Sequence, residues 1–262
     1  MFLFHISDIH YGADPVIGQE KLHKIIDSVN SQAVKPDVVL VTGDLTWKWS
    51  YKEYEPCFKA LDRLAAPYLV ITGNQDKSAD LIKALKAYCP RHPHPETSDC
   101  LQYVVDDYPV RIIAVDTYKE NVGNGGFDKE RQQWLIKKLE DNPHKKPVVI
   151  MVHQFTLPSG SGFFDAHPGD WYESFNRIVA AHQDTVKLVV CGHLHNSLAS
   201  QIGNTPIISG FSTNWSEPLL NARLKTPEHD YIRPSAYHIH HYENGRFTSC
   251  VVTVPGTNVT KR

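Results

Sequence analysis

Cysteine is scarce in this chain, with 5 residues among 262. They stand far apart, at Cys57, Cys89, Cys100, Cys191 and Cys250. Because a disulfide-stapled domain needs closer and more regular cysteine spacing, a disulfide scaffold is excluded as the basis of the fold. Cys89 and Cys100 are near enough in sequence to pair in an oxidising compartment, but free thiols are the favoured interpretation.

The chain also lacks a strong net charge and any long apolar run. Its formal net charge is -2 and it has no stripe rich in Lys and Arg, so we expect no stable nucleic-acid binding. No apolar run approaches the roughly 20 residues of a membrane-spanning helix. The N-terminal run has no basic residues before it and is interrupted by Asp8 and His10, so we do not expect it to be a signal peptide. We therefore expect a cytoplasmic protein without a membrane partner.

Short apolar runs are present, and each ends at or just before polar residues. The runs cover residues 2–6, 38–41, 68–71, 112–115, 148–152 and 188–191. Runs of this length that are rich in β-branched residues are typical of strands buried on both faces, in a sheet covered by helices. In such sheets, ligands bind beyond the carboxyl ends of the strands.

The polar residues that follow these runs are carboxylate, imidazole and amide side chains. They are Asp8, His10, Asp44, Asn74, His153, His193 and His195, with Asp116 and Thr117 in a supporting position. Each motif alone is weak, because Gly43-Asp44 and Gly73-Asn74 also occur in ordinary turns and a single histidine such as His153 is usually structural. Their joint occurrence at strand ends predicts a metal site. Mixed imidazole and oxygen ligands suit Mn, Fe, Zn or Co.

Amphipathic helices are predicted between the apolar runs, over residues 18–31, 51–65, 79–88, 129–141 and 171–182. This alternation predicts an α/β fold with a largely parallel sheet. After residue 205 the order changes, because strands are predicted over 207–209, 237–242 and 248–254. The last two form a hairpin around Asn244-Gly245. These late strands suggest a second sheet packed on the first.

Together, the motifs resemble those of the calcineurin-like metallophosphoesterase superfamily, from residue 2 to about residue 212. The matching motifs are Asp8-Ile9-His10, Gly43-Asp44, Gly73-Asn74-Gln75-Asp76, His153 and Gly192-His193-Leu194-His195. Within the family, the chain is similar to the cyclic-nucleotide and glycerophosphodiester phosphodiesterases. Two segments carry that likeness: Gly126-Phe127 followed by Gln133-Trp134-Leu135, and Pro234-Ser235-Ala236 before a late strand.

The resemblance implies a four-layer α/β/β/α sandwich with two mixed sheets and a centre of two divalent or mixed-valence transition-metal ions. One ion would be held by Asp8, His10, Asp44 and His195, and the other by Asp44, Asn74, His153 and His193. It also implies a hydrolase that cleaves small-molecule phosphodiesters by in-line attack of a metal-bridging hydroxide. Asn74 and Gln75 would occupy the catalytic positions.

Gln75 departs from the family pattern, which usually has a histidine there. That histidine contacts the phosphate and is thought to protonate the leaving oxygen, whereas an amide donates a hydrogen bond but no proton. General acid–base catalysis typically contributes about 10²–10⁴-fold. The enzyme is therefore slowed, or another group supplies the proton, or the substrate has a good leaving group. Gln154, where near relatives often carry a second histidine, is a further departure.

Three alternative functions stay open. A phosphomonoesterase with the same metals is disfavoured by Gln75, because a monoester leaving group gains most from a proton donor. A nuclease is disfavoured by the absence of a basic stripe. A metal-binding scaffold that lost catalysis with Gln75 is disfavoured by the intact ligand set.

Several further residues are weaker candidates. His92 and His94 follow a helix and are expected in an exposed loop, and His238 and His240 are expected on one face of a late strand as ordinary sheet residues. Candidates for the wall of a substrate site are Trp47, Trp49, Asn214, Trp215 and Arg223.

We expect a single metallophosphoesterase domain over residues 1–262. Residues 1–205 would form the core with the metal motifs, and residues 206–262 would supply the second-sheet strands and a substrate-side loop. The segments 155–170 and 211–234 lack periodicity, and loops of this length are often functional. The expected partner is a small-molecule phosphodiester, and a dimer is the favoured homo-oligomer.

Overall fold

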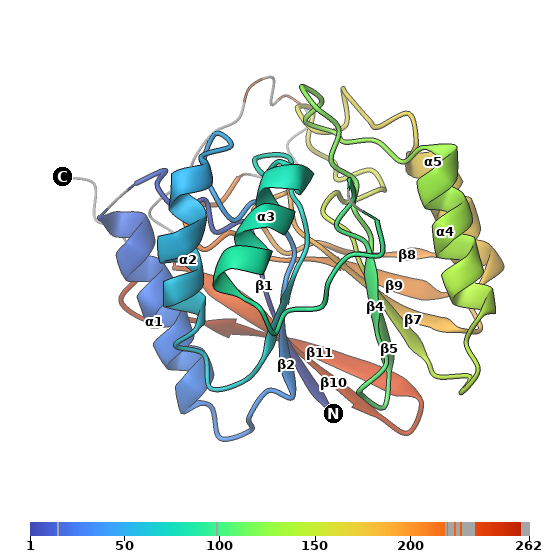
Figure 1. Cartoon of the computed structure of the whole chain (residues 1–262), viewed down its shortest axis with the longest axis horizontal. Coiled ribbons are helices and arrows are strands. Elements are labelled where there is room, and N and C mark those ends of the chain that lie inside the picture. The colour runs from blue at the N-terminus through green and yellow to red at the C-terminus, as the bar shows by residue number, and fades with distance from the viewer. Residues whose placement is uncertain are drawn as a thin grey trace.

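The computed structural model of the chain describes residues 1–14, 16–97, 99–217, 219, 223, 226 and 234–257. Two β-sheets form the middle of the molecule (Figure 1). The first has the order β11 (Arg246–Thr253), β10 (Ala236–Glu243), β1 (Phe2–Ile6), β2 (Val38–Val41) and β3 (Tyr68–Val70). The second has the order β4 (Tyr103–Val105), β5 (Arg111–Ala114), β6 (Val148–Met151), β7 (Val186–Cys191), β9 (Thr205–Ser209) and β8 (Ala199–Ile202).

Helices cover the outer sides of the two sheets. Figure 1 shows α1 (Ile17–Ser31), α2 (Tyr54–Leu61) and α3 (Ser78–Tyr88) on the left, and α4 (Lys129–Glu140) and α5 (Tyr172–Ala181) on the right. A short 3₁₀ turn, η1 (Tyr51–Glu53), precedes α2. At the start of α4, the Asp128 carboxylate accepts a hydrogen bond from the Arg131 backbone N–H, which satisfies an otherwise unpaired helix-end donor. The predicted four-layer α/β/β/α sandwich is confirmed.

The parallel strands are buried because both of their faces are covered. Every residue of β2, β5 and β6 is buried. One hydrophobic core holds residues of both sheets, such as Leu3 and Val39 together with Met151 and Val190. Both sheets are mixed, since β10 runs antiparallel to β1 while β4 and β8 run antiparallel to β5 and β9. Within the described residues, no helix is long and apolar enough to cross a membrane.

The expectation that the late strands build the second sheet holds for β9, which covers the predicted strand at 207–209, but is wrong for the two strands of the hairpin. The predicted hairpin forms, but β10 pairs with β1 and so extends the N-terminal sheet. The second sheet is built on β5, β6 and β7, joined in parallel by β9. The local pattern could not show this division, because the periodicity of a strand does not reveal which other strands it pairs with.

Three buried histidines lie side by side where β10 joins β1. This buried histidine trio consists of His5, His238 and His240, with ring centroids 5.6–5.8 Å apart. The His238 Nε2 atom lies 2.9 Å from the Ser197 hydroxyl. Burial lowers the pKa of His238 to about 4 and that of His240 to about 3. The late-strand histidines are thus sheet residues, as predicted, but they lie inside the molecule.

The trio should make the protein less stable in mild acid. The pKa of His238 is lower in the folded protein than in the unfolded chain, so its stabilising contribution is complete above about pH 6.5 and is lost as the pH falls toward about 4. Between about pH 7.5 and about pH 5, this residue alone should cost about 2 kcal/mol of unfolding free energy.

Urea unfolding of wild type and His238→Phe at both pH values would measure this difference. The lost contact with Ser197 shifts stability equally at both pH values and cancels in the comparison. An equal pH dependence in the two proteins would contradict the assignment of this effect to His238.

Candidate metal centre

The carboxyl ends of strands from both sheets point their following residues at one place. Asp8 and His10 follow β1, Asp44 follows β2, and Asn74 follows β3. From the second sheet, His153 follows β6, while His193 and His195 follow β7. The structure brings all seven of these residues together where the edges of the two sheets meet.

The first group of side chains consists of two carboxylates and two imidazoles. The ligand-type atoms of Asp8, His10, Asp44 and His195 all lie within 4.8 Å of one another, and all four residues are buried. The Nε2 atoms of His10 and His195 are 2.9 Å apart, and the His195 Nε2 lies 3.4 Å from the Asp8 carboxylate. These donors can hold a metal ion, since among the described residues the ion-pair partners of Asp8 and Asp44 are histidines alone, and buried carboxylates need compensating positive charge.

The second group lies on the other side of Asp44. The Asn74 Oδ1 atom is 2.8 Å from His193 Nδ1 and 3.0 Å from His153 Nε2. Asp44 faces both groups, because its Oδ1 lies 3.5 Å from His153 Nε2 while its Oδ2 lies 3.6 Å from His10 Nε2. The carboxylate of Asp44 therefore stands between two sets of donors.

The backbone at this centre adopts a conformation that most residues avoid. Five residues of the two groups have positive φ, at 50° for Asp8, 47° for His10, 51° for Asp44, 69° for His193 and 54° for His195. Non-glycine residues held there cost on the order of 1–3 kcal/mol each, and such residues cluster at functional sites. These sharp bends at the strand ends therefore lower the stability of the fold, and they turn the side chains inward toward the centre.

Two glycines make the close approach possible. A Cβ atom at Gly73 would lie 2.1 Å from the Asp44 carboxylate, and one at Gly43 would lie 2.7 Å from the Nδ1 atom of His153. Gly43 also has a φ of +90°. Crowding inside the centre therefore requires glycine at position 43, before Asp44, and at position 73, before Asn74.

Supporting hydrogen bonds fix several of these side chains. The His153 Nδ1–H donates to the Thr42 carbonyl at 2.7 Å, which turns Nε2 toward the centre. The Asp76 carboxylate accepts from the backbone N–H groups of Leu45 and Gly73 at 3.0 and 3.1 Å, tying the loops after β2 and β3 together. Asp116, for which a supporting position was predicted, accepts hydrogen bonds from the Leu101 N–H at 2.7 Å and from the hydroxyl of Thr72, two residues before Asn74, at 3.4 Å.

His10 and His195 are held by an aromatic ring instead. Among the described residues, neither Nδ1 atom has a hydrogen-bond partner. The Trp215 ring packs on both, with ring centroids 4.6 Å from His10 and 4.8 Å from His195. Trp215, one of the candidates for the substrate-site wall, therefore supports two ligand-type residues.

Burial and charge set the protonation of the imidazoles. Burial lowers the pKa of His10 to about 4 and that of His193 to about 3, so both are neutral, as metal ligands must be. For His153, burial acts in the same direction, but the Asp44 carboxylate outweighs it and raises the pKa to about 9. Against its own burial, Asp44 has its pKa held below the usual range by His153. A metal ion bound by His153 would displace this proton.

A cavity of about 330 Å³ opens onto the centre. Gln75, Trp47 and Trp215 line it, as do Phe163, His167 and Glu217, which were not predicted individually. These three come from the two loops whose length and irregularity marked them as functional. The remainder of the late loop, residues 218 and 220–222 and most of 224–233, lies outside the described residues.

The segment His92-Pro93-His94-Pro95 is not part of the metal centre. His92 was expected in an exposed loop, but it is buried, and its Nε2 accepts a hydrogen bond from the Val70 N–H at 3.1 Å. A buried imidazole here satisfies a backbone donor of the last residue of β3. His92 is therefore a structural residue, and the expectation of exposure is wrong.

The fold and the buried donors define a metallophosphoesterase-type α/β protein. Residues 1–197 match the family model of the calcineurin-like phosphoesterases, and the chain belongs to this family.

Several proteins with assigned names are similar to this chain over most of its length. A probable glycerophosphodiester phosphodiesterase of Arcobacter nitrofigilis is 25% identical over 248 residues, which cover 92% of this chain and 89% of that one. A glycerophosphodiester phosphodiesterase of Enterobacter lignolyticus is 27% identical over 247 residues, covering 90% and 85%. The 3',5'-cyclic adenosine monophosphate phosphodiesterase of Escherichia coli K12 is 22% identical over 202 residues, covering 75% and 70%.

Solved structures show the same fold at lower identity. A purple acid phosphatase of yellow lupin has a TM-score of 0.70 at 12% identity, covering 99% of this chain and 52% of that chain. A 5'-nucleotidase precursor of Thermus thermophilus has a TM-score of 0.57 at 14% identity, covering 98% and 55%. The chain corresponds to about half of each of these larger proteins.

Proposed function

We propose that the chain is a metal-dependent hydrolase of small-molecule phosphodiesters that works with two ions. Asp8, His10, Asp44 and His195 would hold one ion, and Asp44, Asn74, His153 and His193 the other. The single observation that carries this proposal is the position of Asp44, whose two oxygens face the two donor groups at 3.5 and 3.6 Å.

The donor set suits borderline transition metals. It combines neutral imidazoles with carboxylate and amide oxygens and contains no thiolate, which favours Mn, Fe, Zn or Co. When bound, two such ions supply Lewis acidity and an activated water for attack at phosphorus. The protein contributes fixed ligand positions and a cavity lined by residues of both donor groups.

Gln75 would orient the phosphate from the wall of the cavity. Its backbone N–H donates to the Asp44 carboxylate at 2.7 Å, which fixes the residue beside the centre. Its side-chain carbonyl accepts from the Lys48 N–H at 3.2 Å. The amide NH₂ group is then the end that can donate to a phosphoryl oxygen, but it supplies no proton.

Diesters are the favoured substrates for two reasons. The proteins similar to this chain are named as phosphodiesterases, and Gln75 cannot supply the proton from which a monoester leaving group gains most. The similar proteins are named for glycerophosphodiesters and cyclic nucleotides. We expect a higher kcat/KM for bis-(p-nitrophenyl) phosphate than for p-nitrophenyl phosphate in the metal-loaded enzyme. The chelator-treated protein is the control and should hydrolyse neither. A preference for the monoester would overturn the diesterase assignment in favour of a phosphomonoesterase.

Asn74→Ala should damage activity far more than folding. Asn74 is half-buried in a loop beyond the sheet, whereas Ile71 is fully buried in the core. Removing the Ile71 side chain should cost about 2–5 kcal/mol of unfolding free energy. Urea unfolding of the metal-free Asn74→Ala and Ile71→Ala variants, beside kcat/KM of the loaded enzymes, makes the comparison. Equal losses of stability would show that Asn74 has a structural role in the core.

The chain's organisation completes the proposal. We take residues 1–262 as one metallophosphoesterase domain in the cytoplasm, with a dimer as the favoured oligomer. Light scattering coupled to size-exclusion chromatography would measure the oligomeric state.

A further inference from the structure

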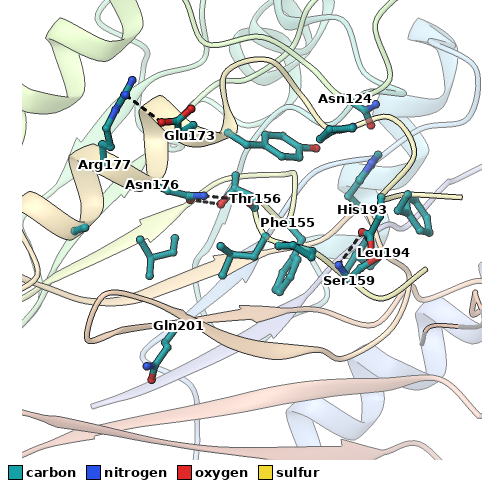
Figure 2. Close-up of a pocket in the computed structure, with 18 of the residues that line it drawn as sticks. Asn124, Phe155, Thr156, Ser159, Glu173, Asn176, Arg177, His193, Leu194 and Gln201 are labelled. Carbon is teal, nitrogen blue, oxygen red and sulfur yellow. Dashed lines mark hydrogen bonds and ion pairs between the residues drawn. The ribbon is translucent and has the colours of Figure 1, made fainter. Parts of the chain in front are cut away.

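A second cavity lies directly beside the metal centre and is larger than the cavity that opens onto it. Its volume is about 590 Å³, within the range of cavities that bind small molecules. It lies between α5, the loop that follows β6, and β8. Figure 2 shows His193 and Asn124 at one end of this cavity and Glu173 and Arg177 toward the other. None of the steps proposed above uses it.

The two cavities share a wall. Asn124, Phe164 and His193 line both of them. The His193 ring presents Nδ1 to Asn74 in the metal centre and packs edge-to-face against Phe164, with ring centroids 5.4 Å apart. The larger cavity therefore begins at residues that also bound the cavity of the metal centre, next to its second donor group.

The walls of this cavity are mainly apolar. Aromatic and aliphatic side chains supply most of the surface: Phe155, Leu157, Phe164, Tyr172, Leu194 and Ile202. Such walls favour an apolar occupant, because transfer of apolar surface out of water is favourable in proportion to its area.

Four of the polar side chains in the walls are already paired with one another. The Thr156 hydroxyl donates to the Asn176 side-chain carbonyl at 2.6 Å, and the Asn176 NH₂ group donates to the Thr156 backbone carbonyl at 2.8 Å (Figure 2). At the outer end, Arg177 forms an ion pair with Glu173 at 3.2 Å. A sugar or glycerol group placed among these walls would exchange hydrogen bonds to water for few new ones, which is costly.

We propose that this cavity binds an alkyl arm of the phosphodiester substrate, so that the preferred substrate class is an alkyl phosphodiester. This inference rests on the proposed function. The phosphate would lie at the metal centre, and the alkyl chain would run past His193 toward the ion pair of Glu173 and Arg177. The cavity then selects by chain length, while the metal centre acts on the ester.

A series of p-nitrophenyl phosphodiesters with methyl, butyl and octyl as the second alcohol tests the inference. The leaving group is the same in all three, so only the alkyl arm varies. For wild type, kcat/KM should rise with chain length by up to about fourfold for each methylene that becomes fully buried. Equal kcat/KM values for the three esters would overturn the alkyl assignment.

Two neighbouring alanines of α5 give a matched pair of variants. Ala180 is half-buried and lines the cavity, whereas Ala181 is exposed and does not. Ala180→Phe should fill the cavity and flatten the rise with chain length, while Ala181→Phe should keep the wild-type rise. Leu157→Ser makes the wall more polar and should also reduce the increase of kcat/KM with chain length. It is the replacement variant if Ala180→Phe does not fold. A wild-type rise in both cavity variants would overturn the inference.

A binding measurement separates this inference from the proposed function. Calorimetric titration of the metal-loaded protein with methylphosphonate and octylphosphonate needs no catalysis. Tighter binding of octylphosphonate to wild type, lost in Ala180→Phe and kept in Ala181→Phe, supports the cavity even if no diester is hydrolysed. Equal affinity for the two phosphonates, in an enzyme that does hydrolyse diesters, rejects the cavity and leaves the hydrolase assignment intact.

Discussion

Replacing Asp44 with alanine should reduce phosphodiester hydrolysis to the background of the assay. Its two carboxylate oxygens face both donor groups, at 3.5 Å from His153 Nε2 and 3.6 Å from His10 Nε2, so the change removes a donor from each. Loss of a group that only supports a metal ligand costs about 10–100-fold. Loss of a shared ligand should exceed that range, and kcat/KM with bis-(p-nitrophenyl) phosphate would measure it.

Metal content should fall together with activity in this variant. Asp44→Asn is the matched variant, because it keeps the volume and one oxygen but removes the negative charge. Circular dichroism of each metal-free protein checks that the fold is kept. An Asp44→Ala enzyme that keeps two ions and at least a tenth of the wild-type activity would show that Asp44 does not link the two donor groups.

Replacing Gln75 with histidine should accelerate the hydrolysis of esters with poor leaving groups. Gln75 lines the cavity of the metal centre but carries no proton that it can transfer. Imidazole transfers protons near neutral pH, and general acid catalysis is typically worth about 10²–10⁴-fold. We expect a gain of about 10²-fold for alkyl leaving groups and less for an activated phenol, because a more basic leaving oxygen depends more on protonation.

The measurement is kcat/KM across esters of graded leaving-group pKa, for wild type and Gln75→His. Gln75→Asn is the control, since it changes the side-chain length without adding a proton donor. Parallel plots, with the same ratio at every leaving group, would mean that position 75 acts through binding or charge. His167 and Glu217, which also line the cavity, would then be the groups to replace in a search for the proton donor.

The local sequence pattern was sufficient to predict most of the elements and where the ligand-type residues would meet, but it missed the two short edge strands β4 and β8. Apolar runs such as residues 38–41 and 148–152 became fully buried strands, because burial on both faces leaves no polar alternation. The carboxyl ends of parallel strands point to one edge, so Asp44 and His153 come together although they belong to different sheets.

The same pattern could not predict which strands pair with one another when they are far apart in the sequence. The position of β10 beside β1, and with it the burial of His238 and His240 against His5, depends on which strands pair across the chain. The two cavities were not predictable for a related reason. Their walls come from irregular loops, such as the one that holds Phe164 and His167, and loop side chains follow no periodicity that reveals their direction.

The presence of two ions that share Asp44 is the central claim. Elemental analysis of the purified enzyme, combined with anomalous scattering from a crystal of it, tests this claim most directly. We predict two metal ions per chain, with the Asp44 carboxylate bound to both, and Asp8 and Asn74 each bound to a different ion. A single ion, or two ions of which one does not contact Asp44, would contradict the account.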